Sequence, residues 1–225
     1  MGGTGGFPID LILFGMIAAF LILRLRSILG RRTGYERPPQ PAPVQPQPMP
    51  RQAGPVIDGR AEPTSPPVQR AVPDPMSPLG LTLGEMKRLD RNFDPVGFLD
   101  GAAKAFGMIV TAFAAGDRVS LRRLLSDDTY QAFEQAITLR ESLGQVQVSE
   151  IRAIPAVTIE GAELRGKVGS VTVRIVSDQI SLTRDKAGAP LVGTDAVTEI
   201  TDLWTFERDL SQPDPAWRLV AARSA

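Results

Sequence analysis

The side chains able to do acid–base chemistry in this chain are carboxylates, tyrosines and lysines, because its 225 residues include no histidine and no cysteine. Their absence excludes a disulfide, a thiol nucleophile, a serine–histidine triad and an ordinary zinc site. Asp202 and Tyr130 could still transfer a proton if the fold buried them side by side. The favoured alternative is that Asp202 pairs with Arg208, which shares its strand face. We therefore assign no catalytic, cofactor or metal site.

Two adjacent acids, Asp127 and Asp128, follow Ser126, a residue that favours the start of a helix. Carboxylates in a first helical turn interact favourably with the helix dipole, so we interpret this pair as structural rather than catalytic. The predicted helix ends near Gly144. Its apolar face consists of Tyr130, Phe133 and Ile137.

A longer helix is predicted to begin at Asp94-Pro95, since aspartate caps orphan N–H groups and proline fits the first helical position. Gly116 is suited to ending it, and Asp117 to opening a short helix. The buried stripe of the long helix is predicted to be Leu99, Ala102, Phe106, Ile109, Val110 and Phe113.

The second half of the chain alternates apolar and polar residues, a pattern typical of strands with one buried face. Turns are expected at Gly161, at Asp178 and between Asp185 and Gly188. The apolar positions are Val146 and Val148, Val157 and Ile159, Val171, Val173 and Ile175, and Ile180 and Leu182, followed by strands over residues 197–208 and 217–221. Helices followed by such strands predict an α+β fold, with the N-terminal helices packed on a twisted antiparallel sheet.

A sheet that curls round the helices would have a concave face lined by aromatic and apolar side chains. On this face Trp204 and Trp217 are expected to pack together. The favoured interpretation is a packed core, and the alternative is a pocket for an apolar ligand. The set is Phe106, Phe113, Tyr130, Phe133, Trp204, Phe206, Trp217 and Leu219.

The N-terminal region contains an apolar run, Leu11 to Leu23, with no basic residue before it and several after it. This order is the reverse of a signal peptide, so we expect an uncleaved transmembrane anchor over Phe7 to Leu29. A helix lying on the membrane surface and a core helix are the alternatives. Because basic residues mark the cytoplasmic side, the chain is predicted to run with its N-terminus outside. The residues at that membrane interface are Arg24, Arg26, Arg31 and Arg32.

Residues 30–78 are predicted to be a disordered proline-rich linker, since fourteen of the 20 prolines lie between Pro38 and Pro78. Proline fixes φ and removes a backbone donor, so neither helix nor sheet is expected there. Residues 79–225 are long enough for one domain with its own core. Their acidic residues outnumber the basic ones by three, which argues against a nucleic-acid partner.

Several segments of this last region together resemble a known family. They are FDPVGFLDGAAKAF from Phe93, AFAAGD ending at Asp117, LLSDDTYQAF ending at Phe133, and DLWTFER from Asp202 with PAWRLV from Pro215. They resemble, over about residues 85 to 223, the translocase of the inner membrane (TIM) subunit 44-like domain in its membrane-anchored bacterial form. The resemblance implies a cone-shaped α+β fold related to the NTF2-like superfamily, and docking at the inner face of an energy-conserving membrane.

Three classes of function follow. The leading one is a non-catalytic adaptor at a bacterial inner membrane that holds a protein client or assembly partner. The second is a lipid-binding module, in which an acyl chain enters the aromatic concavity and the arginines meet anionic headgroups. The third is an enzyme using Asp202 and Tyr130. The charged helical region that recruits a chaperone in the mitochondrial relatives is replaced here by the proline tract, so chaperone recruitment is not expected.

The predicted orientation can be measured with single cysteines, because the chain has none of its own. In cells with a permeabilised outer membrane, an impermeant maleimide should label Thr4→Cys, whereas Ser77→Cys should stay unlabelled until the inner membrane is opened. The reverse pattern would contradict a cytoplasmic domain.

Overall fold

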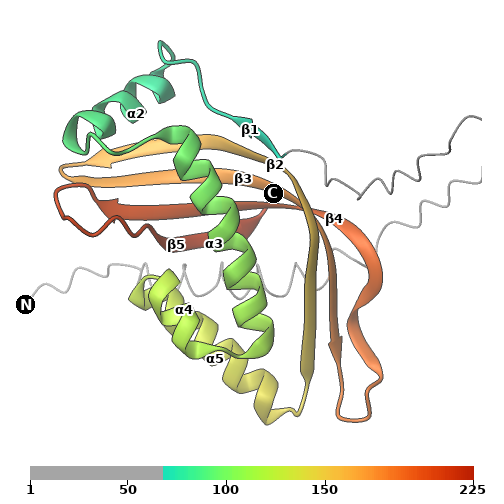
Figure 1. The fold of residues 1–225 in the computed structure, drawn as a ribbon. Helices are drawn as coiled ribbons and strands as arrows, with labels where there is room; N and C mark the ends of the chain where they lie inside the picture. Colours follow the sequence, from blue (N-terminus) through green and yellow to red (C-terminus); the bar gives the residue numbers. More distant parts are fainter. Residues whose placement is uncertain (1–67) are drawn as a thin grey trace, which may run out of the picture.

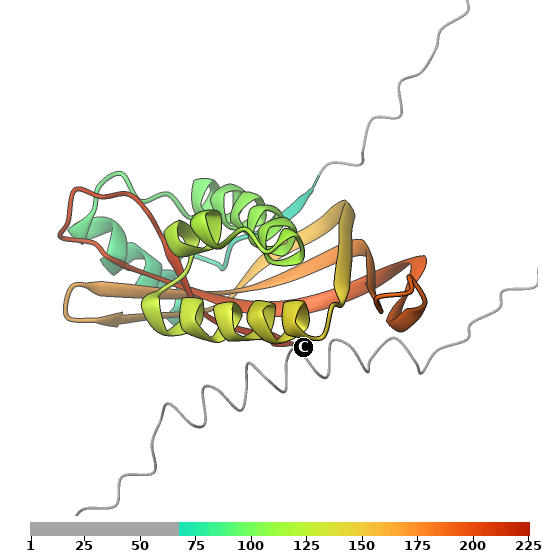
Figure 2. The ribbon, with the colours of Figure 1, turned by 90° about the horizontal axis from the view of Figure 1, so that it is seen from below.

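The computed structural model of the protein describes residues 68–225. The expected anchor, its interfacial arginines and most of the proline-rich segment lie outside these residues. The described elements are β1 (Gln69–Ala71), α2 (Pro78–Leu89), α3 (Pro95–Ala115), α4 (Arg118–Leu124), α5 (Asp127–Ser142), β2 (Val146–Arg165), β3 (Val168–Arg184), β4 (Pro190–Asp209) and β5 (Arg218–Ser224). Four helices pack against a five-stranded sheet, and α3 lies across its concave side (Figures 1 and 2).

The helix ends predicted from the sequence are confirmed. The Asp94 side chain accepts a hydrogen bond from the Gly97 N–H, and Pro95 is the first residue of α3. Gly116 ends α3 in the left-handed region with φ 71°, which glycine adopts without strain. Asp117 and Ser126 cap α4 and α5 in turn. Helix α2, capped by Ser77, was not expected.

The sheet is mixed rather than purely antiparallel. Strands β2 to β5 form an antiparallel meander in sequence order, but β1 pairs with β2 in parallel. The expectation that no sheet occurs between Pro38 and Pro78 is therefore wrong for Gln69–Ala71. These residues lie between Pro67 and Pro73, in a stretch where every N–H remains available for pairing.

Two of the three predicted turns are wrong, because β2 and β3 are longer than the sequence suggests. Asp178 lies within β3 and pairs with both neighbouring strands, and the turn after β2 is at Gly166. Gly161 lies at one of three irregularities where β2 carries an extra residue. Such bulges bend a strand and reverse which residues face the core. The turn between Asp185 and Gly188 is confirmed.

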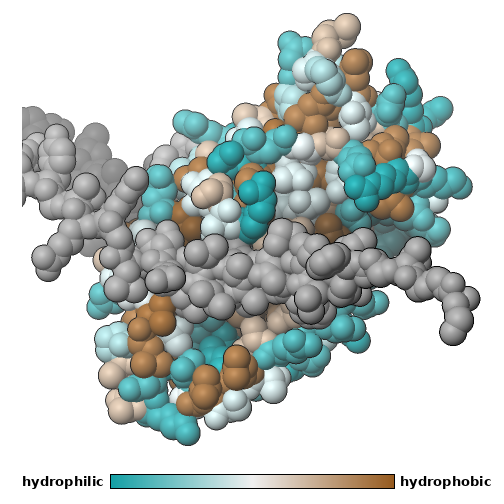
Figure 3. Space-filling model, turned by 180° about the vertical axis from the view of Figure 1, so that it is seen from behind, coloured by the Kyte–Doolittle hydropathy of each residue, from teal (hydrophilic) through white to brown (hydrophobic). Residues whose placement is uncertain are grey.

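Val146 and Val148 are not buried as predicted, because the apolar residues at this end of β2 lie on the face that points away from the helices. They are 59% and 42% exposed, whereas the intervening Gln147 faces the helices and accepts a hydrogen bond from Arg140 Nη1 of α5 at 2.6 Å. At this end of the sheet the helix-facing side is polar. Its buried members on β3 are Ser177, Gln179, Ser181 and Thr183. The opposite side of the domain mixes hydrophilic areas with separate hydrophobic groups (Figure 3).

Helix α3 crosses the concave side of the sheet and supplies the centre of the core (Figure 1). By length and composition it could cross a membrane, but in this structure its apolar stripe packs against the sheet as part of the core. All six residues predicted for that stripe are buried. Phe106 is fully buried, with its ring centroid 4.7 Å from that of Trp204 on β4.

The importance of this contact can be tested by comparing two residues of α3. Phe106→Ala should lower the free energy of unfolding by about 3–5 kcal/mol, as expected for truncating a large buried aromatic side chain. Met108→Ala is the matched control, since Met108 is 51% exposed and surface truncations usually change stability by less than about 0.5 kcal/mol. Urea unfolding followed by tryptophan fluorescence measures both, and equal losses would contradict the packing described.

Candidate docking groove

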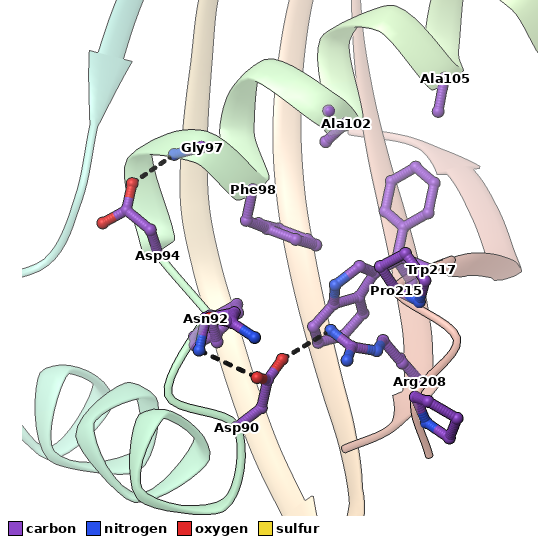
Figure 4. A pocket seen from close by; sticks show the side chains of 14 residues that line it. Asp90, Asn92, Asp94, Gly97, Phe98, Ala102, Ala105, Arg208, Pro215 and Trp217 are labelled. Atoms are coloured by element: carbon purple, nitrogen blue, oxygen red, sulfur yellow. Dashed lines mark hydrogen bonds and ion pairs between the residues drawn. The ribbon is translucent and has the colours of Figure 1, made fainter. Parts of the chain in front are cut away.

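A groove of about 410 Å³ opens at one end of the concave side, between the start of α3 and the loop from β4 to β5 (Figure 4). The structure forms it from small residues on α3. Gly97, Gly101 and Ala105 are spaced by four residues and so lie on one helix face, where they leave room above the sheet. The remaining lining residues are Asp90, Asn92, Phe93, Asp94, Phe98, Ala102, Phe206, Arg208, Pro213, Pro215 and Trp217.

Aromatic rings form the apolar wall of this groove. The Trp217 ring centroid lies 4.8 Å from that of Phe98 and 5.7 Å from that of Phe93, and Phe98 also contacts Phe206 edge-on at 6.2 Å. Phe93 and Phe98 are buried, whereas Trp217 is only partly buried. The exposed part of Trp217 therefore offers a rigid apolar surface to a ligand, supported from behind by the two phenylalanines.

A largely buried ion pair lies beside the aromatic wall. Arg208 Nη1 is 2.9 Å from Asp90 Oδ2, and each side chain is only 10% exposed. Arg208 also donates from Nε to the carbonyl oxygen of Asp214, and Asp90 accepts from the Asn92 N–H, both at 2.9 Å. These bonds tie the α2–α3 connection to β4 and to the β4–β5 loop. Removing either charge would leave the other buried without its counter-ion, which is strongly destabilising.

This pair corrects the expectation that Arg208 would bind Asp202. The two residues share a face of β4, but Arg208 is at the groove end, and its carboxylate partner comes from Asp90 at the end of α2. Asp202 lies fully buried further along β4, opposite Ile175 of β3 and Ser224 of β5. The alternation of residues along β4 shows which residues share a face, but it could not predict that the partner of Arg208 comes from a distant segment.

Most of the predicted aromatic concavity is filled by its own side chains. Phe106 packs on Trp204, and Phe113 on Phe133 with ring centroids 5.1 Å apart. Seven of the eight residues are buried, and only Phe206 and Trp217 line the groove. The buried seven are Phe106, Phe113, Tyr130, Phe133, Trp204, Phe206 and Leu219.

The expected contact between Trp204 and Trp217 is wrong. Trp204 lies opposite Ala222 in the β4–β5 register, and its ring contacts are Phe106 and Phe206. Trp217 precedes β5 and turns its ring toward Phe93 and Phe98 at the groove.

Tyr130 is held by neighbouring side chains of the helices. Its hydroxyl donates to Glu134 Oε1 at 3.0 Å, and the Arg122 guanidinium lies 4.4 Å from its ring centroid. Burial, together with the bond to Glu134, raises the pKa of Tyr130. A phenol whose pKa is raised stays protonated at neutral pH, the opposite of what a general base needs.

The adjacent acids behave as predicted for a helix start. Asp127 and Asp128 are in the first turn of α5, where Asp127 is 3.5 Å from Arg122 Nη1 at the surface. Within residues 68–225 no group of three or more acidic side chains could hold a metal ion.

The groove was missed from the sequence except for Phe206 and Trp217. Two signals could have located it. One is the spacing of Gly97, Gly101 and Ala105 along an otherwise apolar helix, and the other is the pair Pro213 and Pro215, which shape the facing loop.

The described residues define an α+β domain whose curved, mixed sheet holds a core helix and leaves an aromatic groove at one end. The Tim44-like domain family matches residues 79–224, so the chain belongs to that family. No curated protein matches it.

Two solved structures are similar at low identity. The intermembrane-space region of the chloroplast protein ARC6 is 10% identical, with a TM-score of 0.42, covering 56% of this chain and 95% of its own. A dehydratase candidate of the NTF2-like family from Streptomyces avermitilis is 12% identical, with a TM-score of 0.32, covering 54% of this chain and 91% of its own. Both scores are low, and neither likeness supports a functional conclusion for this chain.

Proposed function

We propose that this protein is a non-catalytic, membrane-anchored adaptor whose domain docks a protein client or assembly partner at the inner face of a bacterial cell membrane. Membership of the Tim44-like family supports a membrane-associated scaffold role in general. In this proposal residues 7–29 anchor the chain, the proline-rich segment gives the domain reach, and Arg24, Arg26, Arg31 and Arg32 contact membrane lipids on the cytoplasmic side.

The observation that carries the docking role is the groove at the start of α3. Its wall offers Trp217, a residue type that contributes strongly to protein interfaces because it buries much area with few rotatable bonds. Its volume of about 410 Å³ suits one or two apolar side chains of a partner.

The polar groups of the groove favour a polypeptide over an acyl chain. Asp90 and Arg208 already neutralise each other, and Asp94 is committed to capping α3. These groups give fixed polar points beside an apolar wall, the arrangement that orients a ligand with polar groups of its own. An acyl chain has no polar group along its length, so it could make no use of these points.

The absence of catalysis is part of the proposal and has its own support. Tyr130 is held by Glu134, and Arg208 by Asp90, so neither is poised to exchange a proton with a substrate. Apart from that ion pair, the groove is lined by apolar side chains, backbone, one amide and the capping carboxylate of Asp94.

A photo-crosslinker can identify the class of partner. Benzoylphenylalanine in place of Asn92, an exposed residue of the groove, should form discrete protein adducts in cells of the native host. The matched control is Val119, which is 67% exposed on α4 and outside the groove, and it should give none of these adducts.

Each other outcome would count against the docking role. Adducts that contain only lipid would replace the adaptor by the lipid-binding alternative. Equal protein adducts at both positions would show that contacts at the groove are unspecific.

A further inference from the structure

Strand β1 occupies the outer edge of β2 although it contributes little to the core. Gln69, Arg70 and Ala71 pair in parallel with Ala156, Val157 and Thr158, and all three are exposed. An edge strand presents a row of backbone donors and acceptors that any extended segment can complete. The pairing of β1 with β2 therefore shows that an extended segment can add to the sheet at this edge.

The contacts of β1 show which side chains such a peptide needs. Arg70 lies opposite Val157, a core residue, so its side chain points toward the helices, where it forms an ion pair with Asp100 of α3. Val68, two residues earlier and so on the same side, packs against the core. Gln69 and Ala71 face away. The edge of β2 is therefore suited to a segment with an apolar residue followed two positions later by a basic one.

The shape of β2 limits the length of this acceptor edge. Irregularities between Ala153 and Ala156 and between Ile159 and Gly161 bracket the paired segment. Pro155, inside the first of them, supplies no backbone donor. Regular pairing is confined to the short stretch between them, which matches the three residues that β1 fills.

The resident strand is held weakly enough to be replaced. The side chains of Arg70 and Asp100 are 36% and 40% exposed, and ion pairs this exposed contribute about 0–1 kcal/mol. Few backbone bonds and little burial place β1 among the elements that open locally at low cost.

We infer that the edge of β2 at Ala156–Thr158 is a peptide-docking site occupied in the resting state by β1. The partner it fits is an extended segment parallel to β2, with an apolar residue two positions before an arginine or lysine. This site is separate from the groove, so it stands or falls independently of the function proposed above.

The test uses the full chain in detergent micelles and a fluorescein-labelled peptide with the sequence of residues 68–72. Arg70→Glu places a glutamate beside Asp100, and the repulsion between the two carboxylates should release β1 from the edge. When β1 occupies the edge of β2, the free peptide can bind only to the fraction of molecules in which β1 has detached, which lowers its apparent affinity. The Arg70→Glu chain should therefore bind the peptide about tenfold more tightly than the unmodified chain. Fluorescence anisotropy measures both affinities. Val68→Ser, which weakens β1 without changing charge, should shift binding in the same direction.

Charge exchange provides the matched control. Arg70→Glu combined with Asp100→Arg restores an ion pair within the chain and should return peptide binding to the weak level of the unmodified protein. The Arg70→Glu chain should also discriminate against a peptide that carries glutamate at the arginine position. Equal affinity of the unmodified and Arg70→Glu chains, with both shown to be folded by circular dichroism, would overturn the inference. Equal binding of the two peptides would do so as well.

Discussion

The packing of α3 into the bent sheet is the contact on which the rest of the domain depends. Phe106 meets Trp204 at the centre of the concave side, and no side chain there is exposed enough to line an open cavity. The sheet can wrap the helix because β2 carries extra residues at three places, each of which adds bend and twist. One helix thereby covers apolar residues of β2, β3 and β4 together.

With its centre filled, the concave side has its groove at one end. Gly97 and Gly101 leave space above the sheet at the N-terminal end of α3, and the groove opens there beside Phe98. Because small residues form the α3 side of the groove, the groove keeps its shape only if the wall opposite α3 is held in place. The ion pair between Asp90 and Arg208 fixes it, by joining the α2–α3 connection to β4 and its following loop. Core packing and a buried charge pair together produce a preformed groove, as the proposed docking role requires.

The sequence was sufficient for features set by neighbouring residues. The caps at Asp94, Gly116 and Ser126 and the apolar stripe of α3 depend on contacts within one or two helical turns. Features set by distant segments were not predictable: the Asp90–Arg208 pair joins residues far apart in the chain, and β1 pairs in a region whose prolines argued against a sheet. Between these extremes, the alternation at Val146 and Val148 correctly indicated a strand but not its buried face, because at this end of the sheet the residues facing the helices are polar and the apolar ones face away.

The central claim, a concavity filled at its centre and open at one end, can be tested with the two tryptophans. Trp204 is 1% exposed, and Trp217 lies partly exposed in the groove. In single-tryptophan variants, acrylamide should quench Trp217 readily after Trp204→Phe and quench Trp204 only weakly after Trp217→Phe. Efficient quenching of Trp204 in the folded protein would show an open central pocket and contradict this structure. Equally weak quenching of both would mean that the groove is closed.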